Sequence, residues 1–360
     1  MDFPLKSISK KPFPKTHSLR EKNPLLYDKN NRTCYVLGYK LISQILSEKE
    51  NDARVIPDQL SYLRLSLPSL SGIDHKNTRS HYFEKITALL RHDFSQIFQD
   101  QAKRNLDAVR SKWFTELSKD LVTPYAVDCV CLVYGIKRNS WDNLIQLIPS
   151  PDKEVKKNII LDALDEKGLL YQICFTNESW PLEKQLAEFN MVLTAGKENI
   201  VRSLMNLIPF FLSNKKAMGM LRNKDFSSEQ LVIEGLRLHG PLWMMTKSYL
   251  SDICFSGYTI PNKYSVKLCV FSGNRDGGVF DNPDSFDPTR KIQPLLYGRG
   301  LRRCPGEKIA NNIIFAFFDV FREYAPSMRT WPIEFTKRKV GKFGLTRAFE
   351  TYHLRMVHNI

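Results

Sequence analysis

Apolar residues recur at every third or fourth position over most of residues 39–221, and few segments alternate. This spacing lines apolar side chains along one face of a helix, so the pattern predicts a mainly helical region. The longest stripe follows a helix start signal at Ser179-Trp180-Pro181. It continues for about seven turns through Leu182, Leu186, Phe189, Leu193, Gly196, Ile200, Leu204 and Leu207.

The character of the chain changes after a second helix. That helix is expected to start at Ser227, where Gln230 completes a capping box, and to stop at Gly240-Pro241. Residues 253–270 follow the pattern of a hairpin in a small sheet. A Pro- and Asp-rich coil is expected over residues 281–294, then a further helix, and short strands at the end of the chain.

No linker or internal repeat divides the sequence, so it predicts one domain over residues 1–360. The expected fold class is mainly α with a small β region. Residues 1–35 are rich in Lys, Pro and Asn, and we expect them to form an irregular lead-in.

The composition is that of an ordinary globular protein, with 42% hydrophobic and 25% charged residues. No run approaches the roughly eighteen apolar residues that a membrane-spanning helix needs. Residues 1–6 lack the apolar core of a secretory signal. The seven cysteines are scattered and odd in number, which favours a reduced chain over a disulfide framework. We therefore expect a cytoplasmic protein without a membrane span.

The net charge is +15. A solvated basic surface explains this charge without any function, and an acidic partner protein or a nucleic acid would also be attracted to it. No basic run interleaved with aromatic residues and no nucleic-acid motif stands out, so no nucleic-acid partner is expected.

The strongest chemical signal surrounds Cys304, in the sequence YGRGLRRCPG of residues 297–306. Glycines four residues before and two residues after the cysteine permit a tight turn and close approach to a flat group. Amides at the start of a following helix favour a thiolate. The alternative is a buried cysteine in a glycine-rich turn. Four fixed residues at about 1 in 20 each match by chance on the order of 10⁻³ times across the chain, which disfavours that alternative.

This run resembles the haem-binding signature of the cytochrome P450 family, FxxGxRxCxG. Gly300, Arg302, Cys304 and Gly306 match the signature, and Tyr297 stands where it has Phe. The resemblance covers about residues 75–318 and implies the mainly helical P450 fold. It also implies that Cys304 is the proximal iron ligand of haem b, that Arg302 contacts a haem propionate, and that Tyr297 lies beside the cofactor.

Glu234 and Arg237 share one helix face at i,i+3 and can form an ion pair. Alone, they are as well explained by an incidental surface pair worth roughly a few tenths of a kcal/mol. They resemble the ExxR motif of the same family, which implies a buried pair that braces the cysteine loop, with Arg290 as a third member. Residues 274–276 and 280–290 also resemble the NRD and PxxFxPxR segments of bacterial P450s.

His75 and Arg79 lie on one helical face, where two solvated polar residues are an equally good explanation. They resemble the family's HxxxR, which implies that they bind a haem propionate. A buried anionic edge needs such cationic donors. Lys247 stands where many relatives have Arg, and the resemblance implies that it also contacts a propionate, as a point charge rather than a fork.

The long helix carries the sequence TAGKEN over residues 194–199, which resembles the family's oxygen-activating segment, AGxxT with an acid before the Thr. Gly196 is expected to leave room for dioxygen, and the alternative is a packing site. Glu198 keeps the acid. Asn199 replaces the alcohol and is a poorer proton shuttle. Three outcomes are open: a water relay organised by Asn199, oxidation without oxygen insertion, or feeble turnover.

The resemblance implies a haem-thiolate monooxygenase that oxidises a small organic molecule in secondary metabolism, with electrons from a ferredoxin or flavodoxin. A basic surface at Arg299, Arg303 and Lys308 is expected to dock such an acidic partner, and the enzyme is expected to be a monomer. The alternatives are haem-thiolate chemistry without insertion (oxidative coupling, dehydrogenation or peroxide-driven oxidation) and a haem-binding protein without turnover. The stretch between Arg79 and Gly196 is short for the family, so the sequence does not indicate the substrate.

Overall fold

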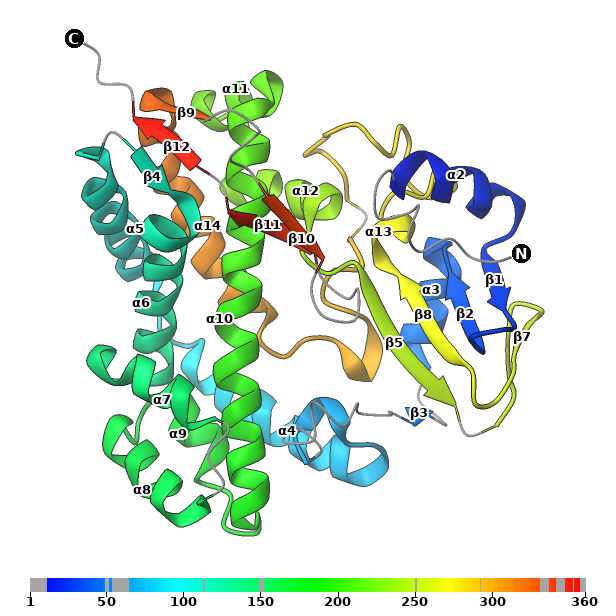
Figure 1. Ribbon diagram of the computed structural model, residues 1–360, viewed down its shortest axis with the longest axis horizontal. Coiled ribbons are helices and arrows are strands. Elements are labelled where there is room, and N and C mark those ends of the chain that lie inside the picture. The colour runs from blue at the N-terminus through cyan, green and yellow to red at the C-terminus, as the bar shows by residue number, and fades with distance from the viewer. Residues whose placement is uncertain are drawn as a thin grey trace. The chain divides into compact units, whose positions relative to one another are not determined.

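The computed structural model describes residues 12–48, 52–53, 65–112, 114–148, 152–249, 251–291, 293–330, 337–340, 347–351 and 353–356. Its backbone contacts divide the chain into two compact units. The first unit comprises Met1–Val55, Asn206–Cys304 and Arg338–Glu350, and the second comprises Ile56–Met205, Pro305–Lys337 and Thr351–Ile360. Figure 1 shows the elements of both units.

The first unit is built around a five-stranded sheet with strand order β1-β2-β8-β5-β3. These strands are β1 (Leu25–Asp28), β2 (Thr33–Val36), β3 (Asp52–Ala53), β5 (Met244–Tyr249) and β8 (Ser265–Cys269). Strand β2 runs parallel to β8, with Thr33 opposite Ser265, and the other neighbours are antiparallel. The sheet therefore joins the start of the chain to its second half.

This sheet corrects the prediction of an irregular lead-in. Residues 12–35 instead contain the helix α2 (Pro12–Lys22), β1 and most of β2, while residues 1–11 lie outside the described residues. All four residues of β2 are buried, because the strand lies between β1 and β8 in the sheet. Its partner β8 lies about 230 residues further along the chain. A local pattern of four residues does not reveal such a distant pairing.

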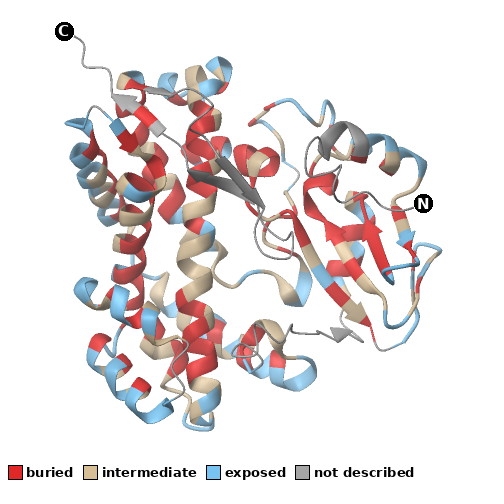
Figure 2. Cartoon of the chain, in the orientation of Figure 1, coloured by how far each residue is buried: buried red, intermediate tan, exposed pale blue. Residues whose placement is uncertain are grey.

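Helix α3 (Tyr39–Ser47) packs its apolar face on the sheet. Leu41, Ile42, Ile45 and Leu46 are buried there together with residues of β2, β5 and β8. Fully burying one such side chain stabilises the fold by about 1.5–3 kcal/mol. Figure 2 shows the resulting band of buried residues along the sheet.

The remaining elements of the first unit are short. They are β6 (Ile253–Phe255), β7 (Tyr258–Ile260), α11 (Lys215–Asn223), α12 (Ser228–His239), α13 (Val270–Gly273) and the 3₁₀ turn η5 (Gly300–Arg302). Strands β6 and β7 pair as a hairpin inside the predicted range 253–270, whereas the later part of that range forms β8 of the five-stranded sheet. The hairpin's turn residues Ser256 and Gly257 both have positive φ, which suits a tight two-residue turn.

The second unit is mostly helical. Its helices are α4 (Gly72–Leu89), α5 (Ser95–Arg110), α6 (Thr123–Tyr134), α7 (Trp141–Leu147), α8 (Lys153–Ala163), α9 (Leu169–Cys174) and α14 (Glu307–Tyr324). Helix α6 is buried along most of its length (Figure 2). A small sheet of β4 (Phe114–Glu116), β12 (His353–Met356) and β9 (Met328–Thr330) accompanies the helices.

Helix α10 (Leu182–Ser213) is the long helix predicted from the apolar stripe, and it supplies residues to both units. Helix α12 carries the predicted capping box between Ser227 and Gln230 and ends at Gly240. A further pair, β10 (Lys337–Val340) and β11 (Arg347–Thr351), lies near the end of the chain. The predicted fold class, mainly α with a small β region, is confirmed. Within the described residues, no helix is long and apolar enough to cross a membrane.

Candidate functional site

The loop that carries Cys304 is shaped by backbone hydrogen bonds and two glycines. The amide of Cys304 donates to the carbonyl of Tyr297 over 2.8 Å, and the amide of Gly298 donates to the carbonyl of Leu295. Gly298 and Gly300 have φ of +72° and +58°, the left-handed region that glycine adopts without strain. A Cβ on Gly300 would also lie 3.0 Å from the Cα of Ser47. The loop therefore requires glycine at both positions.

Burial divides the seven cysteines into two groups. All seven lie in the described part of the chain, outside any disulfide. Five are buried, and burial raises the pKa of Cys34, Cys131 and Cys269 to about 12. Cys254 and Cys304 are exposed. Of these two, Cys254 lies on the β6 strand, whereas Cys304 lies three residues before the first residue of α14.

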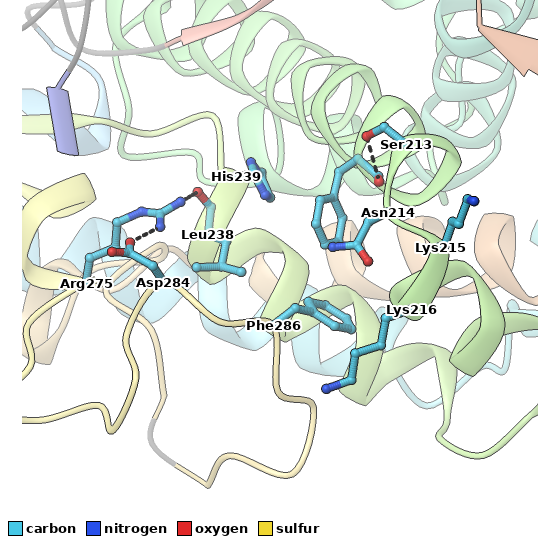
Figure 3. Close-up of a pocket in the computed structure, with 10 residues that line it drawn as sticks. Ser213, Asn214, Lys215, Lys216, Leu238, His239, Arg275, Asp284 and Phe286 are labelled. Carbon is cyan, nitrogen blue, oxygen red and sulfur yellow. Dashed lines mark hydrogen bonds and ion pairs between the residues drawn. The ribbon is translucent and has the colours of Figure 1, made fainter. Parts of the chain in front are cut away.

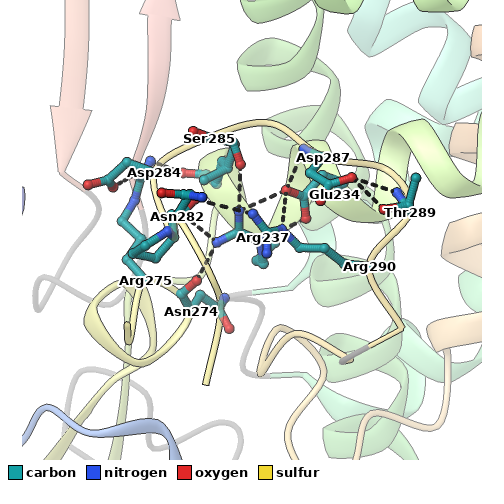
Figure 4. Close-up of polar contacts among 12 residues, drawn as sticks. Glu234, Arg237, Asn274, Arg275, Asn282, Asp284, Ser285, Asp287, Thr289 and Arg290 are labelled. Carbon is teal, nitrogen blue, oxygen red and sulfur yellow. Dashed lines mark hydrogen bonds and ion pairs between the residues drawn. The ribbon is translucent and has the colours of Figure 1, made fainter. Parts of the chain in front are cut away.

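Glu234 and Arg237 form a buried, two-pronged ion pair on α12 (Figure 4). The Nε of Arg237 donates to Oε2 of Glu234 over 2.7 Å, and its Nη2 donates to Oε1 over 2.8 Å. Only 3–4% of either residue is exposed. This parallel geometry is the strongest that an arginine and a carboxylate can adopt.

The rest of the Arg237 guanidinium holds the coil that follows α13. Its Nη1 donates to the carbonyls of Asn274 (2.6 Å) and Pro283 (2.7 Å), and its Nη2 donates to the carbonyl of Ser285 (3.1 Å). Its plane also lies over the ring of Phe280, 4.9 Å from the centroid. All five N–H donors of the guanidinium are therefore in use.

Arg290 also reaches this pair, so the structure brings together the three residues grouped by sequence. Its Nε donates to Oε1 of Glu234 over 3.2 Å, and the amide of Asp287 donates to the same oxygen over 3.0 Å. The side chain of Asn274 then accepts a hydrogen bond from the amide of Leu295, at the start of the cysteine loop. A continuous chain of contacts thus runs from the Glu234 carboxylate to that loop.

On α10, Gly196 makes room for a tyrosine. A Cβ at this position would overlap the hydroxyl of Tyr134, which donates to the carbonyl of Val192 over 3.1 Å. Tyr134 is the last residue of α6, so the glycine allows two helices of the second unit to approach closely. This contact accounts for Gly196 as a packing site, the alternative in the sequence analysis.

Glu198 and Asn199 are engaged with α10 itself. The two oxygens of Glu198 contact the ammonium of Lys197 (2.6 Å) and the guanidinium of Arg202 (3.4 Å). Burial raises the pKa of Glu198, but these two cations outweigh it and leave the pKa below its usual value. The amide of Asn199 is exposed and donates to the carbonyl of Ala195 over 3.1 Å. Near neutral pH, Glu198 is therefore a carboxylate rather than an acid.

His75 and Arg79 lie one turn apart near the start of α4. His75 is buried on the same face as Thr78, Tyr82 and Ile86. Arg79 is half-buried, with its guanidinium 4.5 Å from the ring centroid of Phe83. The helix therefore presents an imidazole and a guanidinium within one turn, as the motif requires.

Lys247 is buried in the five-stranded sheet of the first unit. It lies on β5 with only 2% of its surface exposed. Its ammonium donates to the carbonyl of Ile45 on α3 over 2.8 Å. Since an ammonium has three donors, this bond occupies one of them.

A pocket of about 620 Å³ lies where α11 begins and α12 ends (Figure 3). The rings of Phe210 and His239 are 4.5 Å apart on one wall. Lys216 and an ion pair between Arg275 and Asp284 complete its rim. Among the described residues that line it, none is a predicted site residue.

Two residues with central contacts were missed by sequence reasoning. Tyr134 had no signal, because it lies 62 residues before Gly196 and resembles any apolar position of a buried helix. Glu188 had a weak one: it is an acid inside the apolar part of α10, four residues after Lys184, and it is fully buried. A buried charge of this kind requires partners.

Comparisons with known proteins agree with the motifs. The family model "Cytochrome P450" matches residues 228–324. The chain is 30% identical over 293 residues to "Cytochrome P450 107B1" of Saccharopolyspora erythraea, covering 74% of this chain and 71% of that protein. It is 22% identical over 330 residues to "Putative cytochrome P450 YjiB" of Bacillus subtilis, covering 83% of each.

A solved structure shows the same fold. The cytochrome P450 PksS of the bacillaene polyketide synthase of Bacillus subtilis superimposes with a TM-score of 0.82 at 16% identity, covering 99% of this chain and 100% of that one. Together with the relative that is 30% identical over most of its length, these findings decide the family. The chain belongs to the cytochrome P450 family of haem-dependent monooxygenases.

Proposed function

We propose that this P450 holds haem b through the thiolate of Cys304 and oxidises a small organic molecule of secondary metabolism. The observation that carries the proposal is the Cys304 loop, an exposed thiol on a turn that requires two left-handed glycines and precedes a helix. When bound, haem supplies the activation of dioxygen that a monooxygenase needs.

The described residues fit such a cofactor. Besides its exposed thiol, the loop has Gly306, where an added Cβ would meet no described atom within 4 Å. Its φ is −84°, so backbone strain does not explain the glycine. A flat ligand against the loop would explain it, because a side chain there would occupy the same space.

The other residues have supporting roles in this proposal. His75, Arg79, Lys247 and Arg302 donate to the haem propionates. Tyr297 lies beside the cofactor. Glu234, Arg237 and Arg290 fix the coil that leads into the cysteine loop and touch no substrate.

Electrons come, in this proposal, from a ferredoxin or flavodoxin that docks on basic residues near Cys304. Arg299 is half-buried and donates to the carbonyl of Gln293 over 2.7 Å, Arg303 is half-buried, and Lys308 is exposed. With a net charge of +15, the chain favours an acidic partner.

We propose that the enzyme works as a monomer. Secondary metabolism is supported by the polyketide synthase named for the structural neighbour PksS.

The assignment of Cys304 as the thiolate ligand is tested by replacing the two exposed cysteines, Cys304 and Cys254, one at a time. The reduced carbon monoxide complex of the wild type is expected to show the red-shifted Soret band of thiolate-ligated haem. Cys304→Ser is expected to lose that band, and Cys254→Ser is expected to keep it. A Cys304→Ser protein with an unchanged band would refute the assignment.

A second candidate function is oxidation without oxygen insertion, such as coupling or dehydrogenation. Asn199 favours it, because its amide takes the place of a hydroxyl and donates to the carbonyl of Ala195. Glu198, held as a carboxylate by Lys197 and Arg202, brings no proton of its own.

Restoring the hydroxyl separates the two candidates. If insertion is limited by proton delivery, Asn199→Thr raises the fraction of electrons recovered in oxygenated product, while Asn199→Ala does not. If neither variant changes that fraction, residue 199 does not deliver protons in this enzyme. Formation of a coupled or dehydrogenated product by the wild type would favour the second function.

A further inference from the structure

Helix α4 is bound to α10 by a buried polar cluster that the established activity does not use. At its centre is Glu188, whose side chain is fully buried. The hydroxyl of Tyr82 on α4 donates to its Oε2 over 2.6 Å, and the amide of Leu67, five residues before α4, donates to the same oxygen over 3.1 Å. An ionised carboxylate accepts both bonds.

Lys184 lies one turn before Glu188 and completes the cluster. Its ammonium contacts Oε1 of Glu188 (3.3 Å) and donates to the hydroxyl of Thr78 (3.0 Å) and the carbonyl of Leu65 (3.2 Å). All three of its donors are therefore used. The ammonium also lies over the ring of Trp180, 4.5 Å from its centroid, in a cation–π contact.

The spacing of these contacts fixes α4 in two respects. Lys184 and Glu188 are one turn apart on α10, and their partners Thr78 and Tyr82 are one turn apart on α4. Sliding α4 by one residue moves each partner by about 1.5 Å along the axis and turns it by about 100°. Either change breaks both contacts at once. The cluster therefore sets the height and the rotation of α4.

His75 and Arg79 lie on α4 within one turn of Thr78, so their position follows from that of the helix. We propose that Lys184 and Glu188 are positioning residues for His75 and Arg79 as donors to the haem propionates. The inference rests on the proposed function of that motif. It adds that a carboxylate on α10 determines how tightly haem is held, through its contact with α4.

The experiment measures haem release from the holoenzyme to excess apomyoglobin. His75→Ala and Arg79→Ala are expected to release haem about tenfold faster or more, as loss of a charge-assisted hydrogen bond requires. Glu188→Gln is expected to accelerate release about fivefold to tenfold. The matched control is Glu183→Gln on the same helix, which loses only an exposed contact with Lys153 and is expected to release haem at the wild-type rate.

Coupling separates positioning from a general loss of stability. If Glu188 acts through His75 and Arg79, adding Glu188→Gln to the double variant His75→Ala/Arg79→Ala does not accelerate haem release any further. The propionate bending band in the resonance Raman spectrum is expected to shift in Glu188→Gln but not in Glu183→Gln. If Glu188→Gln does not fold, Tyr82→Phe takes its place in both measurements, because it removes only the hydroxyl that binds Glu188.

The outcomes distinguish this inference from the proposed function. Wild-type release rates for both His75→Ala and Arg79→Ala would refute the propionate assignment itself. Fast release in those two variants, with an unchanged rate in Glu188→Gln and Tyr82→Phe, would overturn the positioning role alone. A full additional effect of Glu188→Gln in the His75→Ala/Arg79→Ala background would also overturn it, because it would show a cause independent of those two residues.

Discussion

Among single side chains, Arg237 has the most demanding surroundings. Its five donors are shared between one carboxylate and three backbone carbonyls, all fixed in direction. A lysine offers one ammonium with three donors and cannot reproduce the planar fork. The site therefore specifies arginine by shape as well as by charge.

We predict that Arg237→Lys lowers the free energy of unfolding by about 2–6 kcal/mol, since the three donors of an ammonium leave at least two of the five buried bonds unmade. Urea denaturation followed by circular dichroism measures this loss. Arg138→Lys, in a pair with Asp128 that is partly exposed, is the control and is expected to change stability by less than about 0.5 kcal/mol. Equal effects of the two substitutions would contradict the argument.

The buried carboxyl of Glu188 is expected to make the free energy of unfolding depend on pH. Burial raises the pKa of Glu188, although the bonds from Tyr82, Leu67 and Lys184 oppose this effect. A carboxyl with a raised pKa stabilises the fold at low pH, and this contribution is lost as the pH rises through the folded-state pKa.

Glu188→Gln has no proton to lose, so its unfolding free energy relative to the wild type is expected to increase as the pH rises above about 4.3, the usual carboxyl value. Urea titrations at several pH values check this. Glu183→Gln is expected to show the opposite slope, because a hydrogen bond from Lys153 lowers the pKa of Glu183. A flat difference for Glu188→Gln would refute the prediction.

At the scale of helices and strands, sequence periodicity located α10 and α12 because each has a long apolar stripe or a capping box of its own. It failed for β2, whose stability depends on pairing with β8 far along the chain. The same limit applies to the site. Spacing on one helix indicated the pair of Glu234 and Arg237, whereas the backbone carbonyls that Arg237 binds come from another segment.

Gly196 shows how two helices constrain one position. We predict that Gly196→Ala destabilises the fold by about 1–3 kcal/mol, because the new methyl group overlaps the hydroxyl of Tyr134. Tyr134→Phe in the same chain is expected to recover part of that loss, as measured by thermal denaturation of both single variants and the double variant. If Tyr134→Phe recovers nothing, the hydroxyl is not the group that the glycine accommodates. Gly219→Ala, where a Cβ meets no described atom within 4 Å, is the control.

For the whole molecule, the sequence predicts one domain, whereas the contacts define two compact units. Helix α10 passes from one unit into the other between Met205 and Asn206 without an interruption. Unfolding either unit alone would break hydrogen bonds inside this shared helix. The single domain therefore remains our prediction.

Differential scanning calorimetry of the holoenzyme is expected to show one cooperative transition, with equal calorimetric and van't Hoff enthalpies. A second measurement uses Met205→Pro, which removes a backbone N–H donor of α10 at the boundary between the two units. That variant is expected to melt at a lower temperature. Two resolved transitions in the wild type would show that the units unfold independently.

The Arg237 guanidinium also has a consequence for biosynthesis. Its acceptors at residues 274, 283 and 285 are made 37 to 48 residues after it. A nascent chain that has just left the ribosome with α12 therefore carries a positive charge that cannot yet be buried. The hydrogen bonds of Arg237 to the coil form only after residues 274–285 have emerged. A chain that stops before residue 274 would never form them.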